Sequence, residues 1–318
     1  MKILVTGAAG FIGSHLSEHL LQNGHELTGI DNFDPFYPEE IKKKNIAVCL
    51  KSPGYKFIRC SLDELATKVN PSEANPDVVV HLAAKAGVRP SIENPQAYLE
   101  TNVNGTMQLL EWMRAGGIKR MVFASSSSVY GNNKKTPFSE SDNVDYPISP
   151  YAFTKKSCEL MNYNYHHLYD ISIINLRFFT VYGPRQRPDL AIHKFFELIY
   201  NNQPIPIFGD GSTGRDYTFI DDTIQGVIKS IERICKAGNS LFETINLGNS
   251  KPVLLTDLVR SIEEVTGKKA ILNHLPMQDG DVERTFADIS LARKLLGYNP
   301  QVNLPDGLSQ FRNWYESK

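Results

Sequence analysis

Cysteine is scarce in this chain, and no two cysteines are close enough in sequence to form a metal-binding pair. The 318 residues include four, Cys49, Cys60, Cys158 and Cys235, with no C-x-x-C spacing. Single cysteines so far apart do not supply the paired thiolate ligands of a zinc or iron–sulfur site. Unpaired thiols are typical of a reducing compartment. We therefore expect no metal site and a cytoplasmic location.

An excess of charge of either sign is also missing, as is any long apolar run. Lys and Arg total 34 against 35 for Asp and Glu, which gives a net charge of −1. A chain so balanced has no bulk electrostatic attraction for nucleic acid or for an anionic membrane. No stretch is long and apolar enough to span a bilayer, and glycines interrupt the signal-peptide-like start MKILVTGAAGFIG. We expect neither nucleic acid nor membrane as a partner.

Short apolar runs alternate with longer amphipathic segments through the first half of the chain. The runs KILVTG, ELTGID, VVVHLA, RMVFAS and ISIINLRF predict buried strands of a parallel sheet. The segments SHLSEHLLQNG, AYLETNVNGTMQLLEWMRAGG and SPYAFTKKSCELMNYNYHHLY predict the helices between them. This alternation is typical of an α/β fold with a doubly wound parallel Rossmann sheet.

After about Thr180 the pattern changes, because prolines and glycines divide the chain into short pieces. We expect a smaller C-terminal α/β lobe there, with the strand–helix pair YTFIDDTIQGVIKSIERI returning to the first lobe. Residues 1–179 with 218–249 are assigned to the first lobe, and residues 180–217 with 250–318 to the second. Within the second lobe, TDLVRSIEEVTG predicts a helix with Thr256 as its N-cap and Gly267 as its terminator.

The first predicted strand runs directly into a glycine-rich turn that opens a helix. Gly7, Gly10 and Gly13 form G-x-x-G-x-x-G, which allows a tight turn and a close approach of backbone to a pyrophosphate at the helix N-terminus. Glycines in such a turn also occur for packing alone. Here a second strand ends at Asp31, whose carboxylate can accept both hydroxyls of an adenosine ribose and would repel a 2′-phosphate. The combination predicts NAD in the first lobe.

Tyr151 and Lys155 lie four residues apart at the start of a predicted helix, so their side chains share one face. A tyrosine with a pKa of about 10 is a poor base at neutral pH. An ammonium ~4 Å away, at an effective dielectric constant of ~20, stabilises the phenolate by about 4 kcal/mol, or about three pKa units. This would bring the phenol close to the range of a general base. The same spacing also arises by chance on many helices, and the glycine motif makes catalysis the better interpretation.

The motifs of the chain resemble those of the extended short-chain dehydrogenase/reductases, specifically the nucleotide-sugar epimerases and dehydratases. TGAAGFIG, HLAA, NVNGT, SSVYG, YAFTK, RFFTVYGP, GRDYTFIDD and TINLG occur in that order along essentially the whole chain. The resemblance implies that Ser126, Tyr151 and Lys155 are catalytic, with Tyr151 removing a sugar hydroxyl proton while NAD takes the hydride. It implies a UDP-sugar bound by the second lobe. It also implies a cofactor site made of Gly7, Gly10, Phe11, Ile12, Gly13, Asp31, Asn32, Leu62, Leu82, Ala83, Ala84, Asn102, Tyr151 and Lys155.

The serine run Ser125–Ser128 distinguishes among the reactions of this family. Related dehydratases and decarboxylases carry acidic residues where this chain has Ser127 and Ser128. Without an acid near C5 or C6 of the sugar, reduction of the ketone from its other face remains, which implies an epimerase. In one departure from the family, Ser61 stands where relatives often carry an Asp next to the adenine.

Within this family, HLPMQDGDVERTFADIS and HLAAKAGVRPSIENP resemble the UDP-glucuronate 4-epimerases, and RFFTVYGPRQRPDLA has Thr180 where epimerases of neutral galactose-type sugars usually have Asn. A C4 ketone beside a C6 carboxylate is a β-keto acid that can lose CO₂, and hydrogen bonds that fix the carboxylate would slow that loss. Ser127, Thr180 and Arg185 are the candidates, although Arg185 and Arg187 could be solvated loop charges. The implied substrate site comprises Arg89, Ser126, Ser127, Thr180, Arg185, Phe208, Arg215, Gln278 and Asp281. The alternatives are a UDP-glucose/UDP-galactose-type or N-acetylhexosamine 4-epimerase, a UDP-glucuronate decarboxylase, and an NAD-binding regulatory protein.

Other patterns have plainer interpretations. The lysine run 42–44 is typical of a solvated face, and His81 of a core residue at a strand end. The helices around 95–115 and 151–168 resemble those that form a four-helix dimer interface in relatives, which implies a homodimer.

Overall fold

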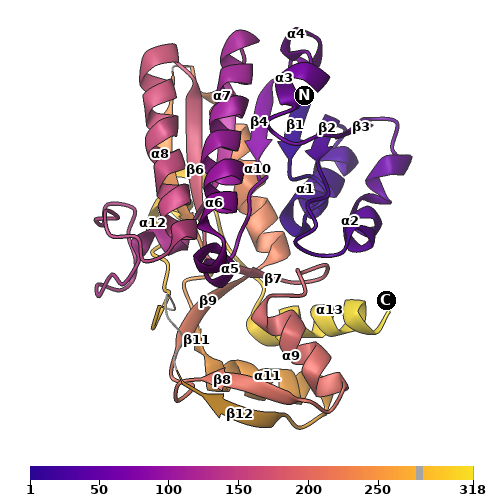
Figure 1. Ribbon diagram of the computed structural model, residues 1–318, viewed down its shortest axis with the longest axis vertical. Helices are drawn as coiled ribbons and strands as arrows, with labels where there is room; N and C mark the ends of the chain where they lie inside the picture. The colour runs from indigo at the N-terminus through magenta and orange to yellow at the C-terminus, as the bar shows by residue number, and fades with distance from the viewer. Residues whose placement is uncertain (239, 277–281, 318) are drawn as a thin grey trace.

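Seven parallel strands form the central sheet of the computed structural model, which describes residues 1–238, 240–276 and 282–317 (Figure 1). Their order is β10–β6–β5–β4–β1–β2–β3, which confirms the doubly wound α/β fold and reverses between β1 and β4. The strands are β1 (Lys2–Thr6), β2 (Glu26–Asp31), β3 (Tyr55–Arg59), β4 (Val78–His81), β5 (Arg120–Ser126), β6 (Ser172–Phe178) and β10 (Phe242–Leu247). The sequence did not predict β3, because Lys56 and Arg59 interrupt its apolar pattern and no residue of it is fully buried.

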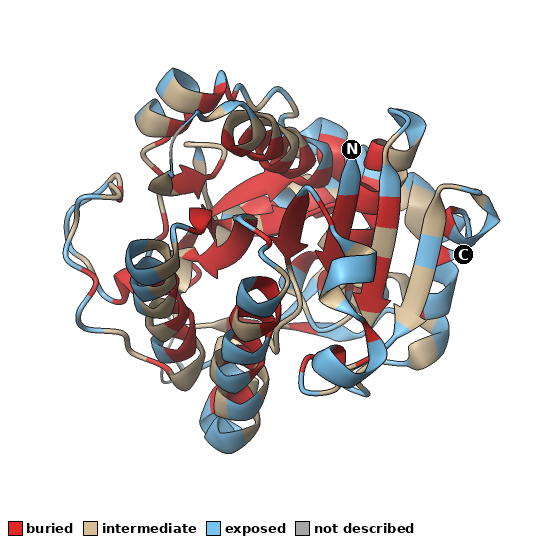
Figure 2. Cartoon of the chain, turned by 90° about the horizontal axis from the view of Figure 1, so that it is seen from above, coloured by how far each residue is buried: buried red, intermediate tan, exposed pale blue. Residues whose placement is uncertain are grey.

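Helices cover both faces of this sheet, and alternate residues of each strand point to the two sides. In β1, Ile3 and Val5 join one core cluster, while Leu4 joins another. The first cluster lies under α1 (Phe11–Gln22) and α10 (Ile220–Lys236), and the second lies under α7 (Gly105–Ala115) and α8 (Pro150–Tyr169). In Figure 2 the buried residues follow the central strands between these layers.

Short helices occupy several of the connections between the central strands. They are α2 (Glu39–Ile46), a 3₁₀ turn (Cys49–Lys51), α3 (Leu65–Lys68), α4 (Pro71–Ala74), α5 (Val88–Glu93), α6 (Pro95–Tyr98) and a second 3₁₀ turn (Ser127–Tyr130). The single helix predicted around 97–117 is divided, because a π-helical turn (Leu99–Asn104) separates α6 from α7. This turn carries the buried Asn102, and π-helical turns of this kind are frequent at functional sites.

The second lobe is smaller and holds two short sheets. One contains β7 (Thr180–Tyr182), β9 (Gly214–Phe219) and β11 (Pro252–Leu254), and the other pairs β8 (Pro204–Phe208) with β12 (Ile271–Leu275). Its helices are α9 (Ala191–Tyr200), α11 (Leu255–Thr266) and α13 (Leu304–Glu316). The division of the chain into lobes stays a prediction, but α12 (Ser290–Leu296) packs against α10 and β10 of the first lobe.

The ends of α11 test two sequence predictions. Gly267 terminates the helix in the left-handed conformation with φ of 68°, as expected. Thr256 as N-cap was wrong, because the helix begins at Leu255 and Leu254 occupies the capping position. None of the helices that the structure describes is both long and apolar enough to cross a membrane.

Candidate active site

A large cavity lies at the carboxyl ends of the central strands, where the strand order reverses. Its volume is about 950 Å³, and both lobes contribute to its walls. This is the position at which open parallel sheets bind their ligands. The residues that line it include members of the β1–α1 turn, the segments after β2 and β4, the serine run at the end of β5, the start of α8, and β7 and β9.

Two glycines of the β1–α1 turn are required by backbone contacts. Gly7 has φ of 70°, and a Cβ there would lie 2.7 Å from the backbone nitrogen of Ala83. A Cβ on Gly13 would lie 2.1 Å from the carbonyl oxygen of Gly7. Gly10 is the N-cap of α1 and has no side chain to accept from its first-turn N–H groups. Packing thus explains Gly7 and Gly13, and the same geometry presents a bare helix N-terminus that fits a dinucleotide pyrophosphate.

Asp31 ends β2 and lines the cavity together with Asn32 and Leu62. Its Oδ1 accepts from the backbone N–H of Phe33 at 2.8 Å and its Oδ2 from that of Ala9 at 3.0 Å. Burial raises the pKa of Asp31, while these two hydrogen bonds act in the opposite direction. A carboxylate oxygen has more than one lone pair, so both oxygens can still accept from a ribose.

Several cavity-lining residues of the cofactor half were not predicted from the sequence, among them Asp34, Phe36, Lys42 and Lys85. Lys85 Nζ donates to Asp34 Oδ2 at 2.8 Å, which joins the segment after β4 to the segment after β2. The expectation that residues 42–44 form a solvated face was wrong for Lys42, which is buried and donates to the carbonyl of Asp34 at 2.6 Å. A signal was present, because Lys42 lies four residues before Ile46 and therefore on the apolar face of α2.

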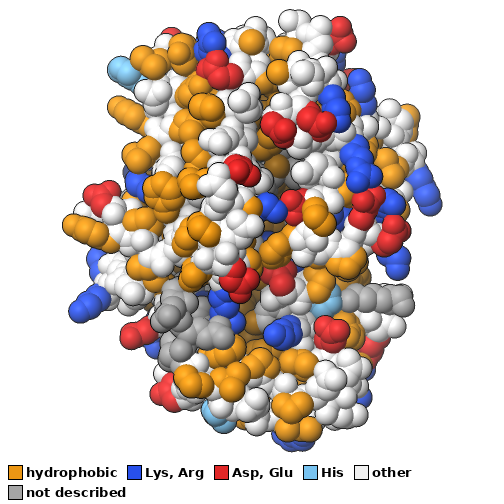
Figure 3. All heavy atoms as spheres, viewed as in Figure 1, with side chains coloured by type: hydrophobic (Ala, Val, Ile, Leu, Met, Phe, Trp, Pro, Cys, Tyr) orange, Lys and Arg blue, Asp and Glu red, His pale blue; other side chains and the backbone are white. Residues whose placement is uncertain are grey.

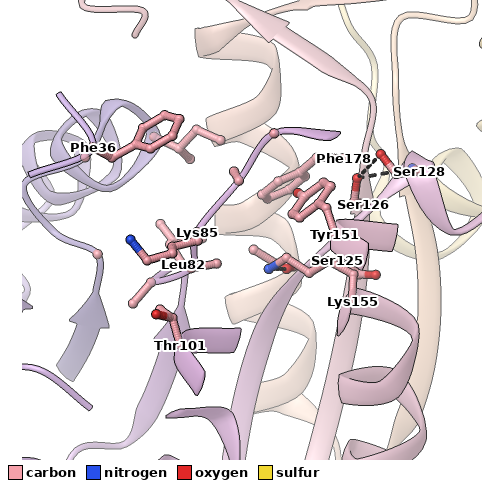
Figure 4. Close-up of a pocket in the computed structure, with 18 of the residues that line it drawn as sticks. Phe36, Leu82, Lys85, Thr101, Ser125, Ser126, Ser128, Tyr151, Lys155 and Phe178 are labelled. Atoms are coloured by element: carbon pink, nitrogen blue, oxygen red, sulfur yellow. Dashed lines mark hydrogen bonds between the residues drawn. The ribbon is translucent and has the colours of Figure 1, made fainter. Parts of the chain in front are cut away.

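The predicted catalytic residues come together on the opposite wall of the cavity. Tyr151 and Lys155 lie on the first turns of α8, which begins at Pro150 with Ser149 as its N-cap, as the sequence predicted for the helix start. Figure 4 shows the Tyr151 ring turned toward Ser126 and next to Phe178. The backbone N–H of Tyr151 donates to Ser91 Oγ at 3.0 Å, which fixes the start of the helix against α5.

The ionisation of Tyr151 differs from the sequence-based expectation. Burial raises its pKa, and the effects that lower it come from a hydrogen bond with Ser126 and from the charge of Arg187, not from Lys155. Lys155 Nζ donates instead to the carbonyl of Ala124 at 2.7 Å and lies over the ring of Phe123. Burial lowers the pKa of Lys155 to about 8.

The four serines have different surroundings, although all of them border the cavity. Ser126 Oγ accepts from the backbone N–H of Ser128 at 3.1 Å and donates to Ser128 Oγ at 3.1 Å. Ser125 Oγ donates to the buried Glu159 at 2.6 Å, behind the strand. Ser127 and Thr180 also line the cavity, so the run and β7 place several hydroxyl groups around one space.

Arg185 does not line the cavity. Its guanidinium forms a bidentate ion pair with Glu18 of α1 at 2.7 and 2.8 Å, so the structure gives its predicted carboxylate-binding role no support. Arg187 lines the cavity in its place, stacks over Phe36 and donates to the carbonyl of Ala86 at 3.4 Å. Asp189 accepts from it at 2.6 and 2.9 Å, and the pKa of Arg187 is raised by this pairing despite burial.

The remaining predicted substrate residues are divided. Arg215 lines the cavity. Arg89 and Phe208 do not, and the Arg89 guanidinium lies 4.5 Å from the centre of the Phe208 ring. Gln278 and Asp281 lie outside the described residues.

The cofactor residues Leu82, Ala83 and Ala84 line the cavity, whereas Asn102 lies behind it. The Asn102 amide accepts from the Lys85 N–H at 2.8 Å and donates to the Lys85 carbonyl at 2.9 Å and to Thr154 Oγ1 at 3.0 Å. Asn102 therefore fixes the loop after β4 against α8. His81 is buried between the hydroxyls of Thr6 and Thr106, as expected for a core residue.

Comparison with known proteins gives matches along the full chain. A family model described as the NAD dependent epimerase/dehydratase family matches residues 3–248. A Rhizobium meliloti protein named probable UDP-glucuronate 4-epimerase is 42% identical, covering 99% of this chain and 97% of the relative. A UDP-glucuronate 4-epimerase of Thermodesulfobacterium geofontis is 43% identical, covering 98% of this chain and 95% of the relative. The crystal structure of UDP-glucuronic acid 4-epimerase from Bacillus cereus, in complex with UDP-glucuronic acid and NAD, has a TM-score of 0.93 and 40% identity over 100% of this chain and 99% of that chain.

The buried ammonium of Lys155 makes a prediction about stability and pH. The folded state releases this proton near pH 8, whereas the unfolded chain keeps it to about pH 10.4. Between these values the unfolded state binds more protons, so the contribution of Lys155 to the free energy of unfolding should rise with pH. The free energy of unfolding of wild type and of Lys155→Met is measured with denaturant at pH 7 to 10. Relative to the variant, the wild type should become more stable as the pH rises. Lys44→Met is the exposed control, and a parallel shift in both variants would contradict the prediction.

Proposed function

Because the chain belongs to the NAD-dependent epimerase/dehydratase family, we propose that it is an NAD-dependent isomerase that interconverts UDP-glucuronate and UDP-galacturonate at C4. The observation that carries this proposal is a continuous cavity that joins a dinucleotide-type glycine turn to the Ser126–Tyr151–Lys155 group and to Thr180, Arg187 and Arg215. The full-length similarity to proteins named UDP-glucuronate 4-epimerase supports the same substrate.

The cofactor half of the cavity would hold NAD. The bare N-terminus of α1 would hold the pyrophosphate, and Asp31 would accept from the adenosine ribose. The predicted cofactor residues that line the cavity, from Gly7 to Ala84 together with Tyr151 and Lys155, would form the wall of this half, and Asn102 would act through the loop after β4. Bound NAD would accept the hydride from C4 of the sugar and return it to the other face.

Tyr151 is the proposed base for the C4 hydroxyl, with Ser126 as its hydrogen-bond partner. Ser126 is held at the end of β5 by the N–H of Ser128, so its oxygen stays beside the phenol through both half-reactions. Lys155 donates to the Ala124 carbonyl, which fixes the end of β5 against α8, and it places a buried proton donor in this wall of the site. After the 4-keto sugar has rotated in the cavity to present its other face, the same phenol would return the proton to the C4 oxygen.

The sugar carboxylate would be bound by Ser127, Thr180 and Arg187. Charge-assisted hydrogen bonds from a guanidinium and hydroxyls are the strong form of carboxylate recognition. They would hold the carboxylate out of alignment with the C4 carbonyl, which slows loss of CO₂ from the β-keto acid. Arg215 would bind the diphosphate from β9.

Replacing the phenol should stop the chemistry and leave the site able to bind. We expect Tyr151→Phe to lower kcat for UDP-glucuronate by about 10²–10⁴-fold, because general-base catalysis contributes that much. Product formation is followed by NMR with and without added NAD, and binding of UDP-glucuronate and NAD by calorimetry. Epimerisation of UDP-glucose in place of UDP-glucuronate would indicate the neutral-sugar alternative. A UDP-pentose product would indicate the decarboxylase. Unchanged turnover in the variant would revive the regulatory alternative.

Arg187 and Arg185 form a matched pair of variants. We expect Arg187→Met to lower kcat/KM for UDP-glucuronate by about 10–100-fold, since a hydrogen bond to a charged group contributes about 1.5–3 kcal/mol. Affinity for UDP alone should change little, and Arg185→Met should leave both quantities close to wild type because Arg185 is paired with Glu18. Equal losses for UDP-glucuronate and UDP in the Arg187 variant would assign it to the nucleotide instead.

A homodimer is part of the proposal. α8 leaves Phe153, Leu160, Tyr163 and Leu168 about half exposed, and Met107 of α7 is exposed beside them. In Figure 3 hydrophobic side chains gather over the part of the surface that α7 and α8 occupy in Figure 1, and such faces mark protein interfaces. The cytoplasmic location is kept as a prediction from the four free cysteines.

The dimer face has its own test. An arginine at position 160 would place a charge in the centre of the helical interface, so Leu160→Arg should halve the mass measured by light scattering. Leu272→Arg, on the exposed β12, is the control. A wild-type protein that is monomeric at all concentrations would exclude this interface.

A further inference from the structure

Asp216 is a buried carboxylate that the proposed chemistry does not use. It lies in β9, next to Arg215, and is fully buried. Its Oδ1 accepts from the backbone N–H of Asn249 at 2.8 Å, and its Oδ2 accepts from those of Ser250 and Ala287, each at 3.0 Å. Burial raises the pKa of this group to about 6, and the three hydrogen bonds oppose that shift. Backbone groups from distant parts of the chain thus satisfy the carboxylate.

These three N–H groups belong to two segments that are far apart in the sequence. Asn249 and Ser250 follow β10, the edge strand of the central sheet, whereas β9 belongs to the sheet of the second lobe. Ala287 lies in the segment 282–288, which crosses between β9 and Phe138. Figure 1 shows β9 running between the two lobes. Asp216 therefore lies where the two lobes and this segment meet.

The segment 282–288 forms part of the substrate half of the cavity. Val282 and Thr285 line it, as do Arg215 and Phe138 on the two sides of the segment. Gly214 and Phe138 pair with the segment through backbone hydrogen bonds of 2.7 to 3.1 Å. Thr285 Oγ1 accepts from the N–H of Asp216 at 3.1 Å, so Asp216 contacts the segment through both its backbone and its side chain.

We infer that Asp216 is a positioning residue for the nucleotide-sugar site: its carboxylate holds the segment 282–288 and Arg215 in one arrangement across the substrate half of the cavity. The inference rests on the proposed function for the identity of the ligand. It does not make Asp216 catalytic, because Asp216 is not among the residues that line the cavity, and its carboxylate accepts its hydrogen bonds from the backbone N–H groups of Asn249, Ser250 and Ala287. Asp216 acts on the substrate through the residues it holds.

The amide of asparagine cannot replace this carboxylate. Both oxygens of Asp216 accept from N–H groups, so either orientation of an Asn side chain places its NH₂ group against a donor. Asp216→Asn has nearly the same shape, but it replaces one acceptor oxygen with an NH₂ donor and removes the negative charge. Asp222 of α10 provides the matched control, because it is also buried and accepts two backbone N–H groups, from Gln301 at 2.9 Å and Val302 at 3.0 Å, away from the cavity.

The test compares Asp216→Asn with Asp222→Asn in the NAD-loaded protein. We expect Asp216→Asn to raise the Kd for UDP, measured by calorimetry, by about tenfold or more, with NAD content unchanged and amide hydrogen exchange faster across 282–288. Asp222→Asn should lower Tm but leave the UDP affinity and this exchange unchanged. A UDP Kd within twofold of wild type in Asp216→Asn, or an equal rise in Asp222→Asn, would overturn the inference.

If Asp216→Asn does not fold, a less disruptive variant, Ser250→Ala, can test the same inference. Ser250→Ala removes only the donation from Ser250 Oγ to the Ala287 carbonyl, at 2.9 Å, beside the same carboxylate. Faster exchange at 285–288 with a smaller rise in the UDP Kd would support the positioning role, and no change in either would refute it. Wild-type protein that bound no UDP would refute the proposed function, and the exchange comparison would still decide whether Asp216 holds the segment.

Discussion

The close contact between the β1–α1 turn and the loop after β4 determines the geometry of the whole cofactor half. The missing Cβ atoms of Gly7 and Gly13 let the turn lie against the backbone of Ala83 and fold back on itself. This brings the N-terminus of α1 to the carboxyl edge of the sheet, where β2, β4 and β5 also end. Asp31, the loop after β4 and the serine run are therefore neighbours in space although they are up to about a hundred residues apart.

The central sheet and the placement of Tyr151 and Lys155 on one helix could be predicted from the sequence because both depend on local patterns. Buried parallel strands are continuous apolar runs, and Tyr151 and Lys155 are neighbours on one helix. β3 was not predictable in this way, since it is an edge strand with charged residues and only partial burial. The π-helical turn at Asn102 was also missed, because its cause is the tertiary fit of Asn102 between Lys85 and Thr154.

Arg185 and Arg187 show that the sequence can predict an arginine at the site without predicting which arginine of the loop lies there. Both arginines belong to one loop, and sequence alone gives them the same chemistry. Arg185 has φ of 65°, and this turn directs its guanidinium to Glu18, while Arg187 points back to the cavity. A left-handed residue inside a loop is set by the packing of the loop, which no local pattern records. Lys42 differs, because its spacing from Ile46 already places it on the apolar face.

The ionisation of Tyr151 has a consequence for how the site would work. Burial outweighs the hydrogen bond with Ser126 and the charge of Arg187, so the chain's own groups favour a neutral phenol. Lys155 does not correct this, because its own charge is destabilised by the same burial and it donates to a carbonyl. A phenolate in this position needs a further positive charge close by, and an oxidised nicotinamide carries one. The base would then be strong only while the hydride acceptor is in its oxidised form, and it would hold its proton once the hydride has been taken up. Proton removal and hydride transfer would be linked by electrostatics alone, without any movement of the protein.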